Sequence, residues 1–306
     1  MHKVAVCICT RGRPQMFARC LDSVVKQIVP SNIEFKIIVV ENDSVQRVKA
    51  LAFSANAVYT FCAPLGIAYV RNVAMVYALH RKADWIVFID DDEVAHSNWL
   101  AKLMSDEYLD TPVLQGFRYI IYPDKLPFWC IDKSHVVNRA DEGKLLQTAA
   151  TYNVRFSSDI PKSGIVFNEI IAFGGGEDTD FFQRARAAGF KIKYTCHAVT
   201  QEAAHLDRLT YWYQIYRAFW GGAAGVFAAR SVHDTFWTYT HKLYTIPINI
   251  VSGIVNLALA PFYCLTGLYH FKRKAISGGR KLATAFGRLC GFVGIVPQAY
   301  KKVSGS

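Results

Sequence analysis

The sequence predicts an α/β protein with a mostly parallel central sheet and a C-terminal helical region that is both apolar and basic. Short apolar runs alternate with segments of helical spacing, which is typical of βαβ units. Polar motifs follow three of these runs, at the positions where ligands of open α/β sheets bind. After Asp234 the chain has no acidic residue but nine Lys and Arg residues, which sets the C-terminal region apart.

The first part of the chain alternates regularly between strand and helix signals. We expect strands over residues 3–9, 35–40, 58–62 and 85–89, helices over residues 16–27 and 67–82, and one more helix after the second strand. The run Trp85–Ile89 is apolar throughout, which indicates a buried strand of a parallel sheet. Residues 113–170 are less regular.

The formal charge of +11 is unevenly distributed, because nine positive charges lie after residue 234 and +2 remains on residues 1–234 (11 − 9 = 2). A nearly neutral body argues against a nucleic-acid partner, and a basic, apolar end favours an anionic membrane surface. The eight cysteines form no CxxC pair, which favours reduced thiols in the cytosol. The first apolar run, Val4–Cys9, is too short for a signal peptide.

Residues 243–271 carry no charged side chain other than His270 and are long enough to cross a bilayer. Pro247 and Pro261 interrupt them, and a crossing would put the basic cluster 272–274 outside the cell, against the positive-inside rule. We therefore expect helices that lie in one leaflet rather than a hairpin completed by residues 282–300. A buried core helix is the remaining alternative.

Three consecutive carboxylates, Asp90, Asp91 and Asp92, follow the buried run. Such crowding raises carboxylate pKa values unless a positive partner is present, and a hard divalent cation with phosphate oxygens is a natural one. The alternative is a solvated acidic turn. The cluster predicts binding of a metal-chelated phosphate compound.

Through five motifs the sequence resembles an inverting, family 2-type glycosyltransferase of the GT-A fold. Within that family it is most similar to bacterial exopolysaccharide enzymes of the succinoglycan type. In chain order the motifs are VAVCICTRGRP, VVENDS, GIAYVRN, FIDDDE and GGGEDTDFFQRARAAGF, which together cover about residues 4–190. The resemblance implies a GT-A domain over residues 1–234, and we assign residues 235–306 to a membrane-associating tail.

The resemblance also implies roles for individual residues. The residues that would bind the nucleotide and diphosphate are Thr10, Arg11, Arg13, Glu41, Asn42, Asp43, Arg71, Asp90 and Asp91. Asp92 would hold Mg²⁺ or Mn²⁺. The Glu-Asn-Asp order departs from the acid pairs that are common in the family, so the side chain that meets the base stays open. Apart from the resemblance, the first loop could be a solvated basic loop, and Arg71 a surface arginine.

Asp178 follows three glycines, Gly174–Gly176, and precedes a helix expected to begin near Thr179. The resemblance makes Asp178 the general base, and direct displacement does need one carboxylate to take the acceptor hydroxyl's proton. The alternative is that Glu177 and Asp178 only complement the positive end of the helix. Glu177, His205 and Arg217 are further candidates for diphosphate or acceptor contacts.

The sequence thus predicts a metal-dependent hexosyltransferase on the cytoplasmic face of the inner membrane, either peripheral or monotopic. Its donor would be a nucleotide sugar, for which the resemblance favours a UDP-linked one, and its acceptor a saccharide on a polyprenyl diphosphate. The alternatives are a polyprenyl-phosphate sugar synthase, a metal-dependent nucleotidyltransferase that releases pyrophosphate, and an inactive lipid-binding adaptor.

Overall fold

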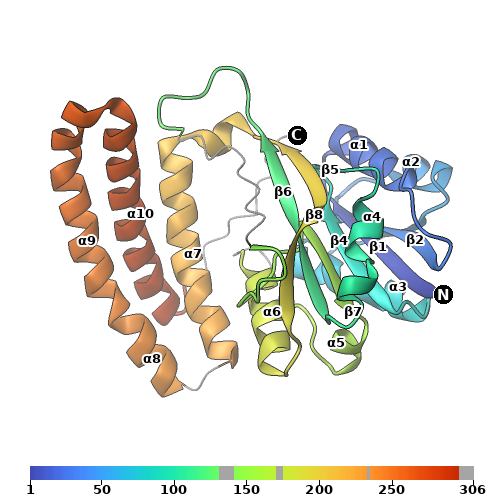
Figure 1. Cartoon of the computed structure of the whole chain (residues 1–306). Helices are drawn as coiled ribbons and strands as arrows, with labels where there is room; N and C mark the ends of the chain where they lie inside the picture. The colour runs from blue at the N-terminus through green and yellow to red at the C-terminus, as the bar shows by residue number, and fades with distance from the viewer. Residues whose placement is uncertain (131–140, 170–174, 233–234, 296–306) are drawn as a thin grey trace.

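The computed structural model describes residues 1–130, 141–169, 175–232 and 235–295 of the 306-residue chain. A twisted sheet flanked by helices forms one part of the molecule, and a layer of long C-terminal helices stands beside it (Figure 1). Gly174, Lys301 and Lys302, and the last residues of the proposed tail, lie outside the described residues.

The elements follow one another in the predicted alternation as far as β4. The strands are β1 (His2–Thr10), β2 (Ile33–Glu41), β3 (Val58–Phe61), β4 (Trp85–Asp90), β5 (Glu93–Ala95), β6 (Val113–Ile121), β7 (Asn153–Ser157) and β8 (Ile192–Ala203). The first six α-helices are α1 (Pro14–Val25), α2 (Lys49–Ser54), α3 (Ile67–His80), α4 (Trp99–Leu103), α5 (Asp159–Lys162) and α6 (Glu177–Ala187). The C-terminal helices are α7 (Tyr211–Val232), α8 (Thr235–Leu243), α9 (Thr245–Leu259) and α10 (Leu268–Phe292), with 3₁₀ turns η1 (Asp106–Tyr108), η4 (Leu206–Leu209) and η5 (Ala260–Thr266).

The strands form one sheet in the order β3-β2-β1-β4-β7-β6-β8-β5. The predicted strands β1 to β4 pair in parallel, as expected. Beyond them, β7 is antiparallel to both β4 and β6, while β6 and β8 are parallel and β5 is antiparallel to β8. The sheet is therefore mixed: it is parallel over the predicted strands and largely antiparallel beyond them.

Helices cover both faces of the parallel half because each helix has an apolar side. On one face, Phe17 and Leu21 of α1 pack in the cluster that contains Val6 and Val87. On the other face, Ala74 and Met75 of α3 belong to the cluster of Ile38 and Phe88. Burial on both faces explains why β1 and β4 are apolar almost throughout, and it fixes the strand ends that carry the polar motifs.

The C-terminal helices α7, α10 and α9 lie side by side, with α9 outermost (Figure 1). Glycines allow this close approach, since a side chain at Gly287 of α10 would overlap the carbonyl of Phe219 on α7, and one at Gly278 would meet Leu257 on α9. The basic segment 272–281, which the hairpin alternative would need as its turn, lies inside the continuous helix α10. A separate second helix that begins at residue 282 is therefore wrong, because residues 282–292 continue the helix α10, which begins at Leu268.

Within the described residues, one helical stretch, Thr240–Thr266, has the length and composition of a membrane span, which is weak support for a membrane role. Only 17% of its most apolar window is buried, so the alternative of a buried core helix is wrong. The boundary at residue 234 stays a proposal, and α7, placed before it, packs extensively on α10 behind it.

Candidate active site

Strand pairing brings the polar strand ends into one row. Thr10 at the end of β1 pairs in register with Glu41 of β2, and Cys9 pairs with Asp90 of β4. At the far edge of the sheet, Glu202 of β8 pairs with Glu93 of β5, which follows the aspartates directly. The chain thus returns, more than 100 residues later, to the acidic cluster.

Asp91 is held by the loop after β1. The Thr10 hydroxyl donates a 2.7 Å hydrogen bond to Asp91 Oδ2, and Arg13 Nη1 lies 3.1 Å from Asp91 Oδ1. Burial raises the pKa of Asp91 to about 6, although the Arg13 charge opposes the shift. Asp91 is buried and is bound by both of these residues, so it holds the loop in place.

Asp92 meets three basic side chains. Arg13 Nη1 lies 3.1 Å from Asp92 Oδ2, His205 Nε2 3.5 Å and Arg208 Nη2 3.8 Å from the same oxygen. Burial alone would raise the pKa of Asp92, but the His205 ring and the Arg13 and Arg208 charges lower it below its usual value. Asp92 is therefore the aspartate that the site keeps ionised.

A metal ion fits beside Asp92. One ligand atom each of Asp92, Glu202 and His205 lies within 4.8 Å of the others. His205 Nε2 is buried and has no hydrogen-bond partner of good geometry among the described residues. Two carboxylate oxygens and an imidazole nitrogen suit Mn²⁺, and the carboxylates suit Mg²⁺. The predicted metal at Asp92 thus has a compatible set of ligand atoms. Glu202, which belongs to this set, was not predicted from the sequence.

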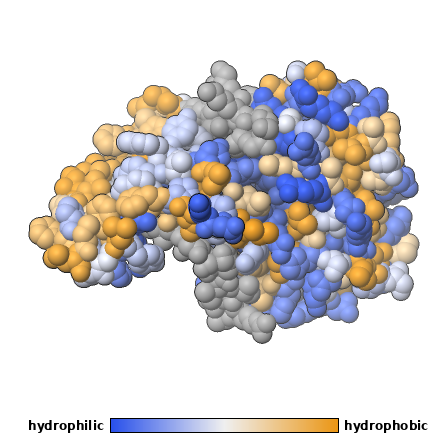
Figure 2. Space-filling view, turned by 90° about the horizontal axis from the view of Figure 1, so that it is seen from above, coloured by the Kyte–Doolittle hydropathy of each residue, from blue (hydrophilic) through white to orange (hydrophobic). Residues whose placement is uncertain are grey.

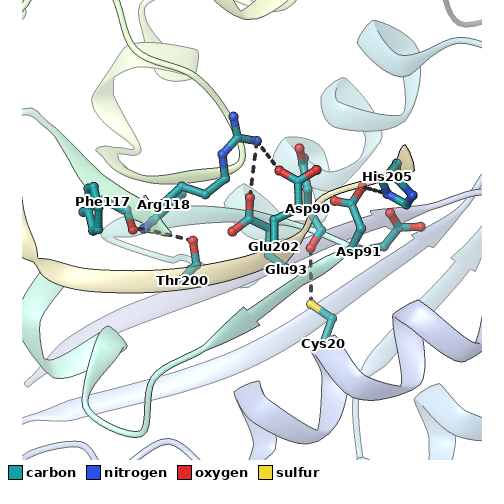
Figure 3. A network of polar contacts seen from close by, with 12 residues as sticks. Cys20, Asp90, Asp91, Glu93, Phe117, Arg118, Thr200, Glu202 and His205 are labelled. Atoms are coloured by element: carbon teal, nitrogen blue, oxygen red, sulfur yellow. Dashed lines mark hydrogen bonds and ion pairs between the residues drawn. The ribbon is translucent and has the colours of Figure 1, made fainter. Parts of the chain in front are cut away.

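A buried charge network supports Glu202 (Figure 3). Arg118 Nη1 of β6 lies 2.8 Å from Glu202 Oε2 and 3.6 Å from Glu93 Oε1, and its guanidinium stacks 4.0 Å from the ring centre of Tyr152. Glu93 is fully buried, and burial raises its pKa well above the usual value. No role was predicted for Arg118 or Glu93, although Glu93 is the last residue of the FIDDDE motif. Nothing local marks Arg118, because its partners come from distant strands.

Arg71 of α3 joins the aspartates to the start of α6. Its guanidinium lies 3.6 Å from Asp90 Oδ1 and forms an ion pair with Glu177, and both Arg71 and Glu177 are buried. Burial raises the pKa of Asp90 and Glu177 despite the Arg71 charge. The next residue, Asp178, is partly exposed and accepts a 2.6 Å bond from the Thr179 backbone. Arg71 therefore brings the predicted donor side and the predicted base together.

Gly176 allows this arrangement at the start of α6. Its φ of 87° lies in the left-handed region that glycine adopts freely, and a side chain there would meet Ala224 of α7 at 2.8 Å. The helix begins at Glu177, two residues before the predicted position.

Two residues of the second strand end point into the fold instead. The Glu41 carboxylate accepts hydrogen bonds from the Arg47 backbone at 2.6 Å and from the Tyr59 hydroxyl at 2.6 Å. Asn42 donates to the carbonyls of Cys62 and Pro64 and accepts from the Gly66 backbone. Both are buried, so the geometry gives them a role in the loops and does not support direct donor contact.

The remaining predicted residues lie nearer to solvent. Asp43 is partly exposed and pairs with Arg47 at 3.1 Å, which leaves it the most accessible acid of the ENDS motif. Arg11 is partly exposed in the loop after β1. Arg217 is exposed on α7, among the aromatic residues Tyr213, Tyr216 and Trp220 of the same helix. Among the described residues, the ion pairs of the acidic cluster do not include Arg217.

The chain is similar in sequence and in fold to known proteins. Residues 5–157 match the sequence profile of glycosyl transferase family 2. The chain belongs to this family. It is 26% identical over 216 residues to the succinoglycan biosynthesis protein ExoM of Rhizobium meliloti (strain 1021), an alignment that covers 66% of this chain and 67% of ExoM.

Solved structures of S. aureus TarS share the fold of this family 2 chain. TarS residues 1–349 in complex with UDP superpose with a TM-score of 0.52 at 16% identity, over 95% of this chain and 92% of that one. A complex with UDP-GlcNAc gives the same values. Against another crystal structure of TarS the TM-score is 0.51 at 17% identity over 91% of this chain, which spans about half (54%) of that TarS chain. The resemblance to family 2 and the GT-A fold class are confirmed.

Proposed function

We propose that this family 2 glycosyltransferase moves a sugar, with inversion, from a UDP-linked donor to a saccharide carried on a polyprenyl diphosphate. The similarity to ExoM supports a role in exopolysaccharide synthesis. The TarS complexes with UDP and UDP-GlcNAc support a UDP-linked donor. The membrane-associated tail would keep the site on the cytoplasmic face, near a lipid-linked acceptor.

One observation carries the proposal: Arg71 contacts both Asp90 and Glu177, and so places Asp178 beside the aspartate cluster. A base for the acceptor must lie close to the donor's anomeric carbon, and this bridge supplies that proximity without a flexible connection. An inactive adaptor would have no need to bury an arginine between these two carboxylates.

The residues divide the work as follows. Thr10 and Arg13 order the first loop over Asp91, and Asp43 is the accessible acid for the nucleoside. Asp92, Glu202 and His205 would hold Mg²⁺ or Mn²⁺, which supplies positive charge to the donor's diphosphate when bound. Asp178 takes the proton of the acceptor hydroxyl as that oxygen attacks the anomeric carbon. Arg71 lies at the junction of these groups, where its charge also favours the departing diphosphate.

The test is release of nucleoside diphosphate by the detergent-solubilised full chain with Mn²⁺, using UDP-, GDP- and dTDP-sugars with and without bacterial lipid extract. We expect lipid-stimulated release of UDP, and a loss of about 10²–10⁴-fold in Asp178→Asn with donor binding retained. Near wild-type turnover of Asp178→Asn would remove the base assignment. Release of pyrophosphate would favour the nucleotidyltransferase, and transfer to bare polyprenyl phosphate the sugar synthase.

A further inference from the structure

The outer side of α9 is apolar without interruption. Ile248, Val251, Ile254 and Val255 are between 48% and 62% exposed. At 100° per residue these four positions fall within an arc of about 120°. Apolar side chains gather at the end of the molecule formed by the C-terminal helices (Figure 2). A contiguous apolar surface of this kind marks an interaction site.

A flank of α9, about 120° around the helix from the centre of the outer side, meets a row of cations on α10. The row, here called the cation ladder, consists of Lys274, Lys281 and Arg288, spaced seven residues apart over about 21 Å of helix. Each member donates to a neutral oxygen of α9: Lys274 to Asn256 Oδ1 at 3.4 Å, Lys281 to Ser252 Oγ, and Arg288 to Thr245 Oγ1 at 2.6 Å.

The C-terminal helices offer no acidic side chain to neutralise the charge of the cation ladder. No acidic residue follows Asp234, and the α9 partners carry no charge. Burial and the positive charge of Arg288 lower the pKa of Lys242, so a fourth basic side chain lies near the ladder. Positive charge beside an apolar helix face is complementary to the phosphates of an anionic lipid surface.

The dimensions of a helix set the depth of this contact. A helix with side chains is about 10 Å across, and a helix in the membrane interface buries its apolar face by about 5–10 Å. With the outer side of α9 immersed, the cation ladder therefore reaches the level of the lipid phosphates. The helix layer of α10 and α7 then stands between α9 and the catalytic domain (Figure 1).

A transmembrane path for α9 conflicts with this packing. α10 lies along α9, and Gly278 of α10 is in contact with Leu257 and Gly253. A crossing by α9 would draw Lys274 and Lys281 into the hydrocarbon region, where cations are strongly unfavourable.

We propose that α9 lies in the plane of one leaflet, with its apolar outer side immersed and the cation ladder bound to phosphates of anionic phospholipids. This inference rests on the proposed membrane association and adds the orientation, the depth and the lipid class.

The first test is co-flotation of the full chain with vesicles of phosphatidylcholine alone or with about one third phosphatidylglycerol. We expect wild type to prefer the anionic vesicles and to lose that preference at high salt. The triple variant Lys274→Gln, Lys281→Gln, Arg288→Gln should bind anionic vesicles roughly 100-fold less, at about 5-fold per cation. A control that removes three exposed charges of the catalytic domain, Lys82→Gln, Lys102→Gln, Lys191→Gln, should bind as wild type does.

Equal binding of the two triple variants would overturn the ladder, and so would wild-type binding that ignores both salt and phosphatidylglycerol. The exposed variant Val251→Ser, Ile254→Ser, Val255→Ser leaves the fold contacts intact and should weaken binding to both kinds of vesicle. Unchanged binding of this variant would overturn immersion of the outer side.

Orientation is tested by labelling Arg273→Cys with a membrane-impermeant maleimide after binding to preformed vesicles, read by mass spectrometry of the peptide. The in-plane arrangement leaves position 273 reactive, as in the control Lys162→Cys, while a crossing of α9 would protect it. UDP release with detergent-dispersed acceptor reports the proposed function separately. The ladder variant should retain that release, so a failure of lipid binding and a failure of transfer are distinguishable.

Discussion

Arg71 is the residue whose removal tests the site most directly, because it is buried between two carboxylates. In Arg71→Met, Glu177 and Asp90 lose their shared guanidinium, and Asp178 loses a nearby positive charge. The 3.6 Å contact to Asp90 corresponds to at most about 4–5 kcal/mol of Coulomb energy at an effective dielectric constant near 20, and water at the 40%-exposed Asp90 side chain screens it to less. Loss of one partner from a buried pair typically destabilises a protein by about 3–5 kcal/mol, and we expect that range at pH 8.

The loss should be smaller at low pH. Burial already raises the folded-state pKa of Glu177 and of Asp90 above the unfolded values. Such acids favour folding while they are protonated, and this contribution disappears as pH rises through the folded pKa. Without Arg71 both pKa values rise further, so the stability of Arg71→Met should fall more steeply with pH than that of wild type.

Urea unfolding of the ligand-free protein at pH 5.5, 7 and 8.5 measures both effects. The control Arg47→Met removes a half-exposed arginine that pairs with Asp43, and it should destabilise by less than about 1 kcal/mol. A loss below about 1 kcal/mol for Arg71→Met, or one independent of pH, would refute the reasoning.

Three further changes test the described contacts. Glu41→Gln should lower stability by about 1–3 kcal/mol, because the Arg47 backbone and the Tyr59 hydroxyl lose a carboxylate as their hydrogen-bond acceptor. Calorimetry should find the UDP affinity of this variant unchanged, and a weakened affinity would mean that Glu41 does bind the nucleotide sugar. In thermal unfolding, Gly287→Ala should destabilise the protein by about 1–3 kcal/mol, because its new methyl group overlaps the Phe219 carbonyl. The control Gly225→Ala, whose methyl group meets nothing within 4 Å, should stabilise the protein by up to about 1 kcal/mol. Equal effects of the two variants would contradict the α7–α10 packing. Glu202→Gln should raise the Mn²⁺ concentration needed for half-maximal UDP release by at least about 10-fold, and an unchanged Mn²⁺ titration would exclude Glu202 from the metal site.

The sequence predicts the parallel half of the fold because its signals are local. Apolar runs such as Trp85–Ile89 indicate buried strands, and their alternation with helical segments predicts parallel pairing. The other half depends on pairings between distant segments. Strand β7 enters antiparallel between β4 and β6, and β8 returns to β5, so Arg118 and Glu202 reach the aspartates through contacts that no local pattern contains.

Individual side chains also look alike in sequence and differ in the fold. Glu41 and Asp90 both end apolar parallel strands, yet Glu41 is turned inward by the backbone donors of Arg47 and Val48, just before α2. The glycines of α10 resemble turn signals, whereas Gly279 and Gly287 are packing contacts with α7. In both cases the missing information is the neighbour, which belongs to another segment of the chain.

The charge pairing of the site finally predicts how a donor must arrive. Arg13 is paired with Asp91 and Asp92, and Arg71 with Asp90 and Glu177, so a bare diphosphate would have to compete with these carboxylates for either guanidinium. A diphosphate alone would have to enter beside these carboxylates, and like charges repel strongly where both are buried. A diphosphate with Mn²⁺ brings its own positive charge, and Asp92, Glu202 and His205 can hold that ion. We therefore expect calorimetry to find UDP binding that is at least about 10-fold tighter with Mn²⁺ than with a chelator, a difference of about 1.4 kcal/mol. Equal affinities would mean that the arginines leave their carboxylates for the diphosphate, and the metal would then have no part in donor binding.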